Sequence, residues 1–153
     1  MDGSRYTALF EAPGGKPILH AYPDPLTKAA PWTIGLGHTG PEVKQDSVWT
    51  EDQCWHAFAN DYMQAQIHGA QVIGSSCWAR LNAPRQGVLA DMAFNIGAGR
   101  LGEFHKMLAA IRQGNWSLAK AELLDSDYAK QVESRAKTNA KTLLSGEWPN
   151  ELA

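Results

Sequence analysis

The feature of this sequence that most constrains its fold is an abrupt change of pattern near Thr50. Before it, the chain is rich in Gly and Pro and holds only short apolar runs. After it, Thr50–Gln53 forms a capping box, and apolar residues then recur every three or four positions. The pattern predicts one long helix from about Glu51 to Ile73. This helix joins a β-containing N-terminal lobe (1–49) to a helical C-terminal lobe (50–153).

The N-terminal lobe begins with a short helix from Ser4, which is a suitable N-cap, to Ala12. Pro13 and the two glycines after it end this helix. Two short strands are then predicted at Ile18–Tyr22 and Trp32–Leu36, separated by a proline-rich turn and loop. We therefore expect a small, loop-rich β lobe built around a hairpin.

The C-terminal lobe reads as a series of helices with clear start and stop residues. The first expected helix starts after the N-cap Asn82 and ends at Gly97 or Gly99, and the second covers Leu101–Gln113. The third runs from Asn115 or Ser117 through Leu124. The last runs from Ser126 to Ser145, with a break near Val132. The expected fold class is therefore α+β and predominantly α, in a single domain of 153 residues.

Composition and charge narrow the class of protein. With 44% hydrophobic residues, a chain of this length buries roughly 70% of its unfolded surface and needs no covalent staple. The two cysteines, Cys54 and Cys77, are accordingly expected to be free thiols, although a bridge between them stays open because the sequence does not give the separation of their Cα atoms. A formal net charge of −2 argues against a nucleic-acid binder, which normally carries a basic face.

Targeting and metal-binding signals are also missing from the sequence. The N-terminal stretch MDGSRYTALFEAPGG lacks a basic region followed by an apolar run, so no signal peptide is expected. No segment reaches the roughly 20 apolar residues that span a bilayer, so stable membrane insertion is not expected. The histidines are scattered, and His38 is expected to be structural. We therefore expect a soluble protein without cofactor or metal.

Three polar residues form a candidate catalytic set. Glu11 lies in the last helical turn, where the negative end of the macrodipole disfavours an ionised carboxylate and so suits a general acid. Asp24 is held between two prolines, and Thr33 lies in the second strand. Each is commonplace alone. Together they supply an acid, a second carboxylate and a water-holding hydroxyl, which are the groups that glycoside hydrolysis uses.

The stretch AYPDPLTKAAPWTIGLGHTG carries a family resemblance. It is similar to the Tyr-x-Asp and Thr-x-Gly-x-Gly-His motifs of phage-type lysozymes, the glycoside hydrolase family 24 endolysins. Two further stretches, AFNIGAG on the central helix and SRAKTNAKTLLSGEW near the C-terminus, also resemble that family. The resemblance implies a lysozyme-like fold with an active-site cleft between the two lobes.

The resemblance also implies roles for individual residues. Glu11 would be the general acid, Asp24 the base or charge stabiliser, and Thr33 the holder of the attacking water. The sugar cleft would be lined by Gly37, Phe94 and Asn95, with Arg135 on its floor orienting the acid, and Trp32 is expected close by. The implied substrate is the glycan strand of bacterial peptidoglycan, cleaved at the β-1,4 bond between N-acetylmuramic acid and N-acetylglucosamine, and the protein is expected to be a monomer.

Two alternatives stay open at this stage. A lytic transglycosylase cleaves the same bond without water, whereas the Asp24–Thr33 pair favours hydrolysis. A lysozyme homologue that only binds peptidoglycan would have no reason to keep the three polar residues.

The intervals between Glu11, Asp24 and Thr33 are longer than the family usually shows, which leaves the inverting or retaining outcome open. As an endolysin, the protein would leave the host cytoplasm through a separate membrane-permeabilising protein.

Overall fold

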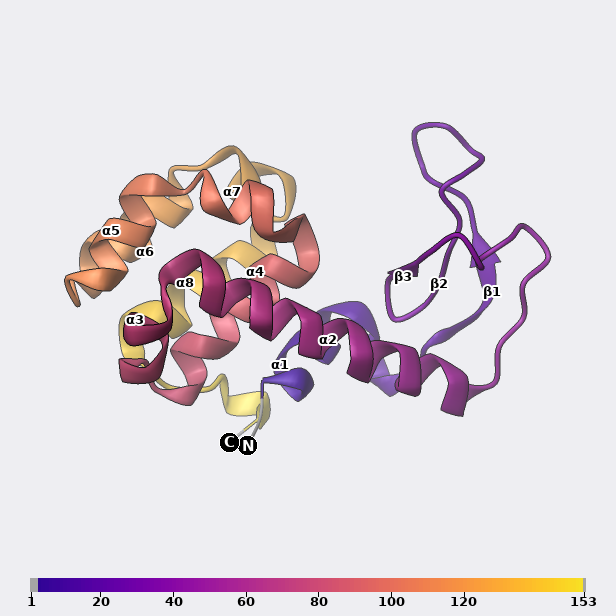
Figure 1. The fold of residues 1–153 in the computed structure, drawn as a ribbon, viewed down its shortest axis with the longest axis horizontal. Helices are drawn as coiled ribbons and strands as arrows, with labels where there is room; N and C mark the ends of the chain where they lie inside the picture. Colours follow the sequence, from indigo (N-terminus) through magenta and orange to yellow (C-terminus); the bar gives the residue numbers. More distant parts are fainter. Residues whose placement is uncertain (1–2, 153) are drawn as a thin grey trace. The chain divides into compact units, whose positions relative to one another are not determined.

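The computed structural model describes residues 3–152 and divides them into two compact units. The first, which we call the sheet unit, comprises Thr7–Met63. The second, the helical unit, comprises the remaining described residues. Together they confirm the predicted α+β class, since most of the chain is helical and one small antiparallel sheet lies near the N-terminus (Figure 1).

The sheet unit begins within helix α1 (Ser4–Glu11), which ends as predicted ahead of Pro13. After a short 3-10 turn at Pro13–Gly15 come strands β1 (Ile18–Tyr22), β2 (Thr33–Gly35) and β3 (His38–Thr39), paired antiparallel in the order β1-β2-β3. The first strand has the predicted bounds, the second is shorter than predicted, and β3 was not predicted. A two-residue strand leaves too little alternation in the sequence to be recognised.

The register of the sheet decides which side chains share a face. Thr33 lies opposite Tyr22 on β1 and opposite Thr39 on β3, while Ile34 lies opposite His38. Because directly opposed residues point to the same side, Tyr22, Thr33 and Thr39 lie on one face and Ile34 and His38 on the other. Ile34 is fully buried, so its face is the one that packs against the core of the sheet unit.

The outer edge of β1 is covered by the segment that leads into helix α2 (Glu51–Ile73). The Ala21 N–H donates to the Ser47 carbonyl at 3.0 Å, and the Trp49 N–H donates to the Leu19 carbonyl at 2.9 Å. These bonds give the edge strand partners for its backbone groups. They also place the start of α2 beside the sheet.

Helix α2 begins at the predicted capping box. The Thr50 N–H donates to Oε1 of Gln53 at 2.8 Å, and the Gln53 N–H donates to the Thr50 hydroxyl at 3.2 Å. Its first residues, 51–63, belong to the sheet unit. Gly35, with φ +72°, allows β2 to approach this helix, since a Cβ there would lie 3.3 Å from the Cβ of Cys54.

The helical unit consists of the rest of α2 and a set of shorter helices. These are α3 (Ser75–Arg80), α4 (Ala83–Gly102), α5 (His105–Arg112), α6 (Trp116–Leu124), α7 (Asp127–Gln131) and α8 (Glu133–Ser145), followed by a 3-10 turn at Asn150–Leu152. Helices α5, α6 and α7 lie together, and α8 packs against α4, α6 and α7 (Figure 1). The core here is apolar and rich in Leu, Met and Ala.

Several helix ends in this unit match the predicted signals. The side chains of Asn82, Asn115 and Ser126 each accept a backbone N–H at the start of α4, α6 and α7. Gly146 ends α8 in the left-handed conformation, at φ +70°. The break near Val132 separates α7 from α8, as predicted.

Two helix assignments differ from the sequence prediction. Helix α3 was not predicted, because its six residues are too few to show a period. The start predicted for the next helix was wrong, since Leu101 belongs to the end of α4 and α5 begins at His105. Helix α4 breaks at Gly97, which has φ +84°, and then resumes for one more turn. No helix within residues 3–152 has both the length and the apolar character needed to cross a bilayer.

Candidate active site

Glu11 is the last residue of α1 and its side chain is half-buried. Pro13 and the glycine pair behind it end the helix here, and Gly15 donates back to the Ala12 carbonyl at 2.8 Å. This places the carboxyl at the C-terminal end of the helix. The position predicted from the sequence for Glu11 is therefore confirmed.

Tyr22 connects Glu11 to the end of the sheet. Burial raises the pKa of the Tyr22 hydroxyl, and the negative charge of Glu11 raises this pKa further. The Glu11 carboxylate is therefore close enough to Tyr22 to act on it electrostatically. Tyr22 is the direct cross-strand partner of Thr33, so these two residues lie at the same end of the sheet.

Asp24 lies two residues beyond β1, at the start of the loop that leads to β2. Its Oδ1 accepts the backbone N–H groups of Leu26 at 2.8 Å and Thr27 at 3.1 Å. Its backbone is fixed as well, by hydrogen bonds with Ala29 and Lys28. The carboxyl group is thus held by its own turn, and Oδ2 accepts no hydrogen bond from the residues that the structure describes.

Thr33 is half-buried at the start of β2 and lies on the same face as Tyr22 and Thr39. Beside it, Trp32 lines a surface hollow of about 620 Å³ together with Thr39, Lys44 and Gln45. Gly37 lies in the turn between β2 and β3 with φ +73°, a conformation that favours glycine. Glu11, Asp24 and Thr33 all belong to the sheet unit, and Asp24 follows two residues after Tyr22, the cross-strand partner of Thr33.

His38 has two carboxylate partners that the sequence did not reveal. Its Nδ1 lies 2.7 Å from Oδ2 of Asp61 on α2, and its Nε2 lies 2.5 Å from Oε1 of Glu42. Burial alone would lower the pKa of His38, but hydrogen bonds and charges from Glu42 and Asp61 together raise it. The structural role expected for His38 agrees with these contacts. Among residues 3–152, no group of three His, Cys, Asp or Glu side chains could hold a metal ion.

Phe94 and Asn95 lie on α4 just before its break at Gly97. Both are half-buried. The Oδ1 atom of Asn95 is inaccessible to solvent and accepts no hydrogen bond from the described part of the chain. A buried acceptor without a donor is costly, so this oxygen is a candidate for bonding a donor on a bound molecule.

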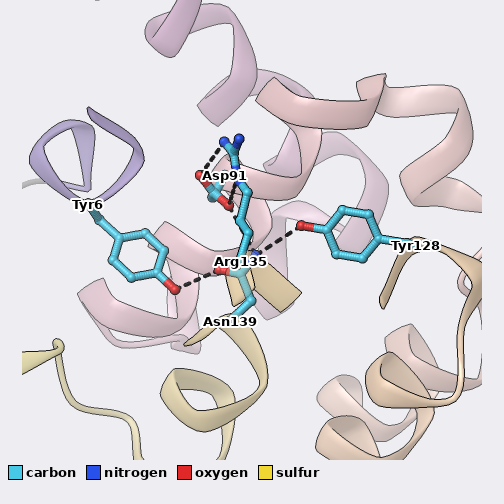
Figure 2. A network of polar contacts seen from close by, with 5 residues as sticks. All are labelled: Tyr6, Asp91, Tyr128, Arg135 and Asn139. Carbon is cyan, nitrogen blue, oxygen red and sulfur yellow. Dashed lines mark hydrogen bonds and ion pairs between the residues drawn. The ribbon is translucent and has the colours of Figure 1, made fainter. Parts of the chain in front are cut away.

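Arg135 lies on α8 and belongs to a buried polar network, shown in Figure 2. Its Nε and Nη2 donate to the two carboxylate oxygens of Asp91 on α4, at 3.0 and 2.8 Å. Asn139 donates to the same carboxylate at 3.0 Å and accepts the Tyr6 hydroxyl at 2.6 Å. Asp91 and Asn139 were not predicted from the sequence. The one signal that could have revealed Asp91 is its position inside the apolar run VLADMAF.

Comparison with known families agrees with these features. The sequence model of the phage lysozyme family matches residues 17–142. The chain belongs to the phage lysozyme family. Most of the candidate site of this lysozyme lies inside the matched stretch, including Asp24, Thr33, Asn95 and Arg135, whereas Glu11 lies ahead of it. Membership in the family supports a lysozyme-type function for this chain.

One protein similar to this lysozyme is the pre-baseplate central spike protein Gp5 of Enterobacteria phage T4. The two are 33% identical over 84 residues. The aligned region covers 55% of the present chain and 14% of the spike protein. The similarity is therefore to one segment of a much longer protein.

Proposed function

We propose that this lysozyme is a muramidase that hydrolyses the β-1,4 bond between N-acetylmuramic acid and N-acetylglucosamine in bacterial peptidoglycan. The observation that carries the proposal is the arrangement in the sheet unit. The charge of Glu11 acts on Tyr22, and Tyr22 is the cross-strand partner of Thr33. An acid and a hydroxyl at one end of a sheet, with the fixed carboxyl of Asp24 on the following loop, suit acid-catalysed glycoside cleavage.

Each of the three residues has a role in the proposed reaction. Glu11 donates a proton to the glycosidic oxygen as the bond to the leaving sugar breaks. Asp24 either removes a proton from the attacking water or stabilises the positive charge that develops on the sugar ring. The Thr33 hydroxyl holds that water in line. These roles place the acid and the water at opposite faces of the bond.

Contacts to the polymer come from further residues. The indole ring of Trp32 offers a face on which a sugar ring can stack, as aromatic rings provide large, rigid apolar surfaces. On the helical unit, the buried Oδ1 of Asn95 is suited to accept the N–H of an acetamido group, which both sugars of peptidoglycan carry. We include Gly37, Phe94 and Arg135 among the substrate contacts.

The first test is mass spectrometry of the products that the protein releases from purified peptidoglycan. Wild type should release fragments with a hydrated reducing-end muramyl group. Glu11→Gln should lower the rate by roughly 10²- to 10⁴-fold, which is the usual contribution of a general acid. Asp46→Asn, which removes an exposed carboxyl of the same unit, is the matched control and should keep full activity.

The other outcomes are equally informative. Anhydro-muramyl products from wild type would identify a lytic transglycosylase and remove the role of Thr33 as a water holder. Release of nothing by a folded wild type, together with binding to peptidoglycan, would identify a binding protein without catalysis. Full activity of Glu11→Gln would show that another group is the acid.

We also propose that the protein acts, as a monomer, as the endolysin of a phage. In this role it accumulates in the host cytoplasm and reaches the wall through a separate membrane-permeabilising protein. Expression in the cytoplasm of a bacterial host should then leave cells intact until a permeabilising agent is added, after which turbidity should fall within minutes. Lysis without the agent would contradict the need for a separate protein.

A further inference from the structure

The connection between β1 and β2 is a loop that projects from the sheet (Figure 1). Asp24 lies near its start, two residues beyond β1. Residues 25–30 are all exposed, and Leu26 is 93% exposed. An exposed loop moves freely unless hydrogen bonds hold it. The position of the Asp24 carboxyl therefore depends on the bonds inside this loop.

The two carboxyl oxygens of Asp24 have different surroundings. Oδ1 accepts the backbone N–H groups of Leu26 at 2.8 Å and Thr27 at 3.1 Å. Two such bonds to one oxygen fix the orientation of the carboxyl group, and they are strong where the carboxyl is ionised. Oδ2 accepts no hydrogen bond within residues 3–152. Oδ2 is therefore the oxygen that remains to face a water molecule or a sugar ring.

Thr27 connects the start of the loop to its end. Its backbone N–H is one of the two donors to Asp24, and its hydroxyl donates to the Ala30 carbonyl at 3.0 Å. The same hydroxyl accepts the Ala29 N–H at 3.2 Å, so it is used both as a donor and as an acceptor. Ala29 in turn accepts the Asp24 N–H at 3.0 Å. Removing the hydroxyl would therefore release the end of the loop from the residue that holds Oδ1.

Lys28 gives a second sign that the bonds hold the loop in one conformation. Its φ is +56°, which is uncommon for a residue with a Cβ. A backbone conformation of this kind persists only where the surrounding structure holds it. Here the Lys28 N–H donates to the Asp24 carbonyl at 2.8 Å.

The end of the loop leads directly to Thr33. Ala30 lies three residues before Thr33, the first residue of β2. At the other end, Asp24 follows Tyr22, which is the cross-strand partner of Thr33. A bonded link between Asp24 and Ala30 therefore fixes the proposed base relative to the residue that is assigned to the attacking water.

We propose that Thr27 is a positioning residue, whose hydroxyl holds the loop so that Oδ2 of Asp24 faces the attacking water or the sugar ring. Thr27 itself does not contact the substrate. The inference rests on the proposed function, because that function gives Asp24 a part in the reaction. It goes beyond that function by naming the oxygen of Asp24 that acts and the side chain that keeps it in place.

The first test compares turnover of soluble peptidoglycan fragments by two variants of Thr27. Thr27→Val keeps the shape and removes both hydroxyl bonds, so kcat should fall roughly tenfold through misplacement of Asp24, while KM stays within about twofold of wild type. Thr27→Ser keeps the hydroxyl and should recover most of the loss. A kcat of Thr27→Val equal to that of wild type, or no recovery in Thr27→Ser, overturns the proposal.

Thr138→Val is the matched control. The Thr138 hydroxyl also donates to a backbone carbonyl, that of Ser134 at 3.1 Å, but it lies on α8 and in the other unit. The same chemical change there should leave kcat within about twofold of wild type, since surface substitutions of this kind have small effects. A tenfold loss of kcat in Thr138→Val would show that loss of any such hydroxyl lowers turnover, and would overturn the specific role of Thr27.

Hydrogen exchange of the Leu26 amide, followed by NMR, gives a readout that does not depend on turnover. This N–H bonds Asp24 and not Thr27, so its exchange rate reports whether the carboxyl stays in place once the Thr27 hydroxyl is removed. Exchange should be severalfold faster in Thr27→Val than in wild type, and close to wild type in Thr27→Ser. An unchanged rate in Thr27→Val overturns the proposal even where kcat falls. Absence of any turnover by folded wild type contradicts the proposed function instead.

Discussion

Among single residues, Thr33 has the most specific expected role, because its hydroxyl is assigned to the attacking water. The residue lies in a strand, where a β-branched side chain is favoured. Valine therefore preserves its shape and its strand preference, whereas serine preserves the hydroxyl. The pair of substitutions separates the chemistry of the position from its fold.

We expect Thr33→Val to lower kcat on soluble peptidoglycan fragments by about tenfold or more, since loss of about 1.4 kcal/mol in the transition state is a factor of ten. Thr33→Ser should lose less than Thr33→Val, because it can still hold the water. Reducing-end assays on both variants, with thermal melts as a check on folding, measure this. Equal losses for the two variants would contradict the assignment, because the hydroxyl that serine retains would then give it no advantage over valine.

Other positions at the residue scale illustrate the limits of sequence reasoning. Glu11 was predicted at the end of α1 because Pro13 and two glycines follow it, and the structure places it there. Tyr22 was noted only as part of a motif, yet its pairing with Thr33 is what connects Glu11 to the sheet. Cross-strand pairing depends on the register of two separate segments, and the sequence of neither segment specifies that register.

At the scale of secondary-structure elements, the contact between β3 and α2 depends on one histidine. His38 on β3 bonds Asp61 on α2, and also Glu42 in the loop that follows β3. The pKa of His38 is raised in the folded state, so its contribution to stability is fully present below its ordinary value of 6.5 and is lost as the pH rises through the raised value. The pKa of Glu42 is lowered from its ordinary 4.5, so its contribution fades only as the pH falls below 4.5.

The expected result is a window of pH in which the contact stabilises the protein. Replacing His38 by Asn should reduce the free energy of unfolding by about 0.5–1 kcal/mol near pH 5.5, a modest value because Glu42 is more than half exposed. The difference from wild type should shrink by pH 9. Urea melts of both proteins at several pH values measure it, and Glu42→Gln should show the same decline. A difference that stays constant from pH 5.5 to 9 would contradict the assignment.

On the scale of the whole molecule, the two units each contain one buried thiol. Cys54 lies in the sheet unit and is 0% exposed, while Cys77 lies in the helical unit and is 6% exposed. Burial and the charge of Glu51 raise the pKa of Cys54, which makes its thiol a slow nucleophile while the unit is folded. Each cysteine can therefore report the opening of its own unit.

We expect Cys54 to become reactive at lower urea concentrations than Cys77. The sheet unit is the smaller of the two, and small units bury a smaller fraction of their surface and open more readily. Pulse labelling with a thiol reagent, followed by peptide mass spectrometry, resolves the two sites in one sample. Parallel labelling of both cysteines at every urea concentration would show instead that the chain unfolds as one cooperative unit.

The sequence by itself determined the features that depend on neighbours along the chain. The capping box at Thr50, the caps at Asn82 and Ser126, and the stop at Gly146 all involve groups within about four residues of each other. So does the placement of Glu11 at a helix end. Local hydrogen bonds and backbone preferences decide these features, and both are readable from residue types at fixed spacing.

Only the tertiary structure decided the polar contacts that connect distant segments. Arg135 meets Asp91 across 44 residues, and Tyr6 meets Asn139 across 133. The contact between His38 and Asp61, which are 23 residues apart, is of the same kind. In each case the packing of helices or strands brings the two groups together, and burial then strengthens a contact that would be weak in water. Residue types alone give no sign of which distant groups will meet in this way.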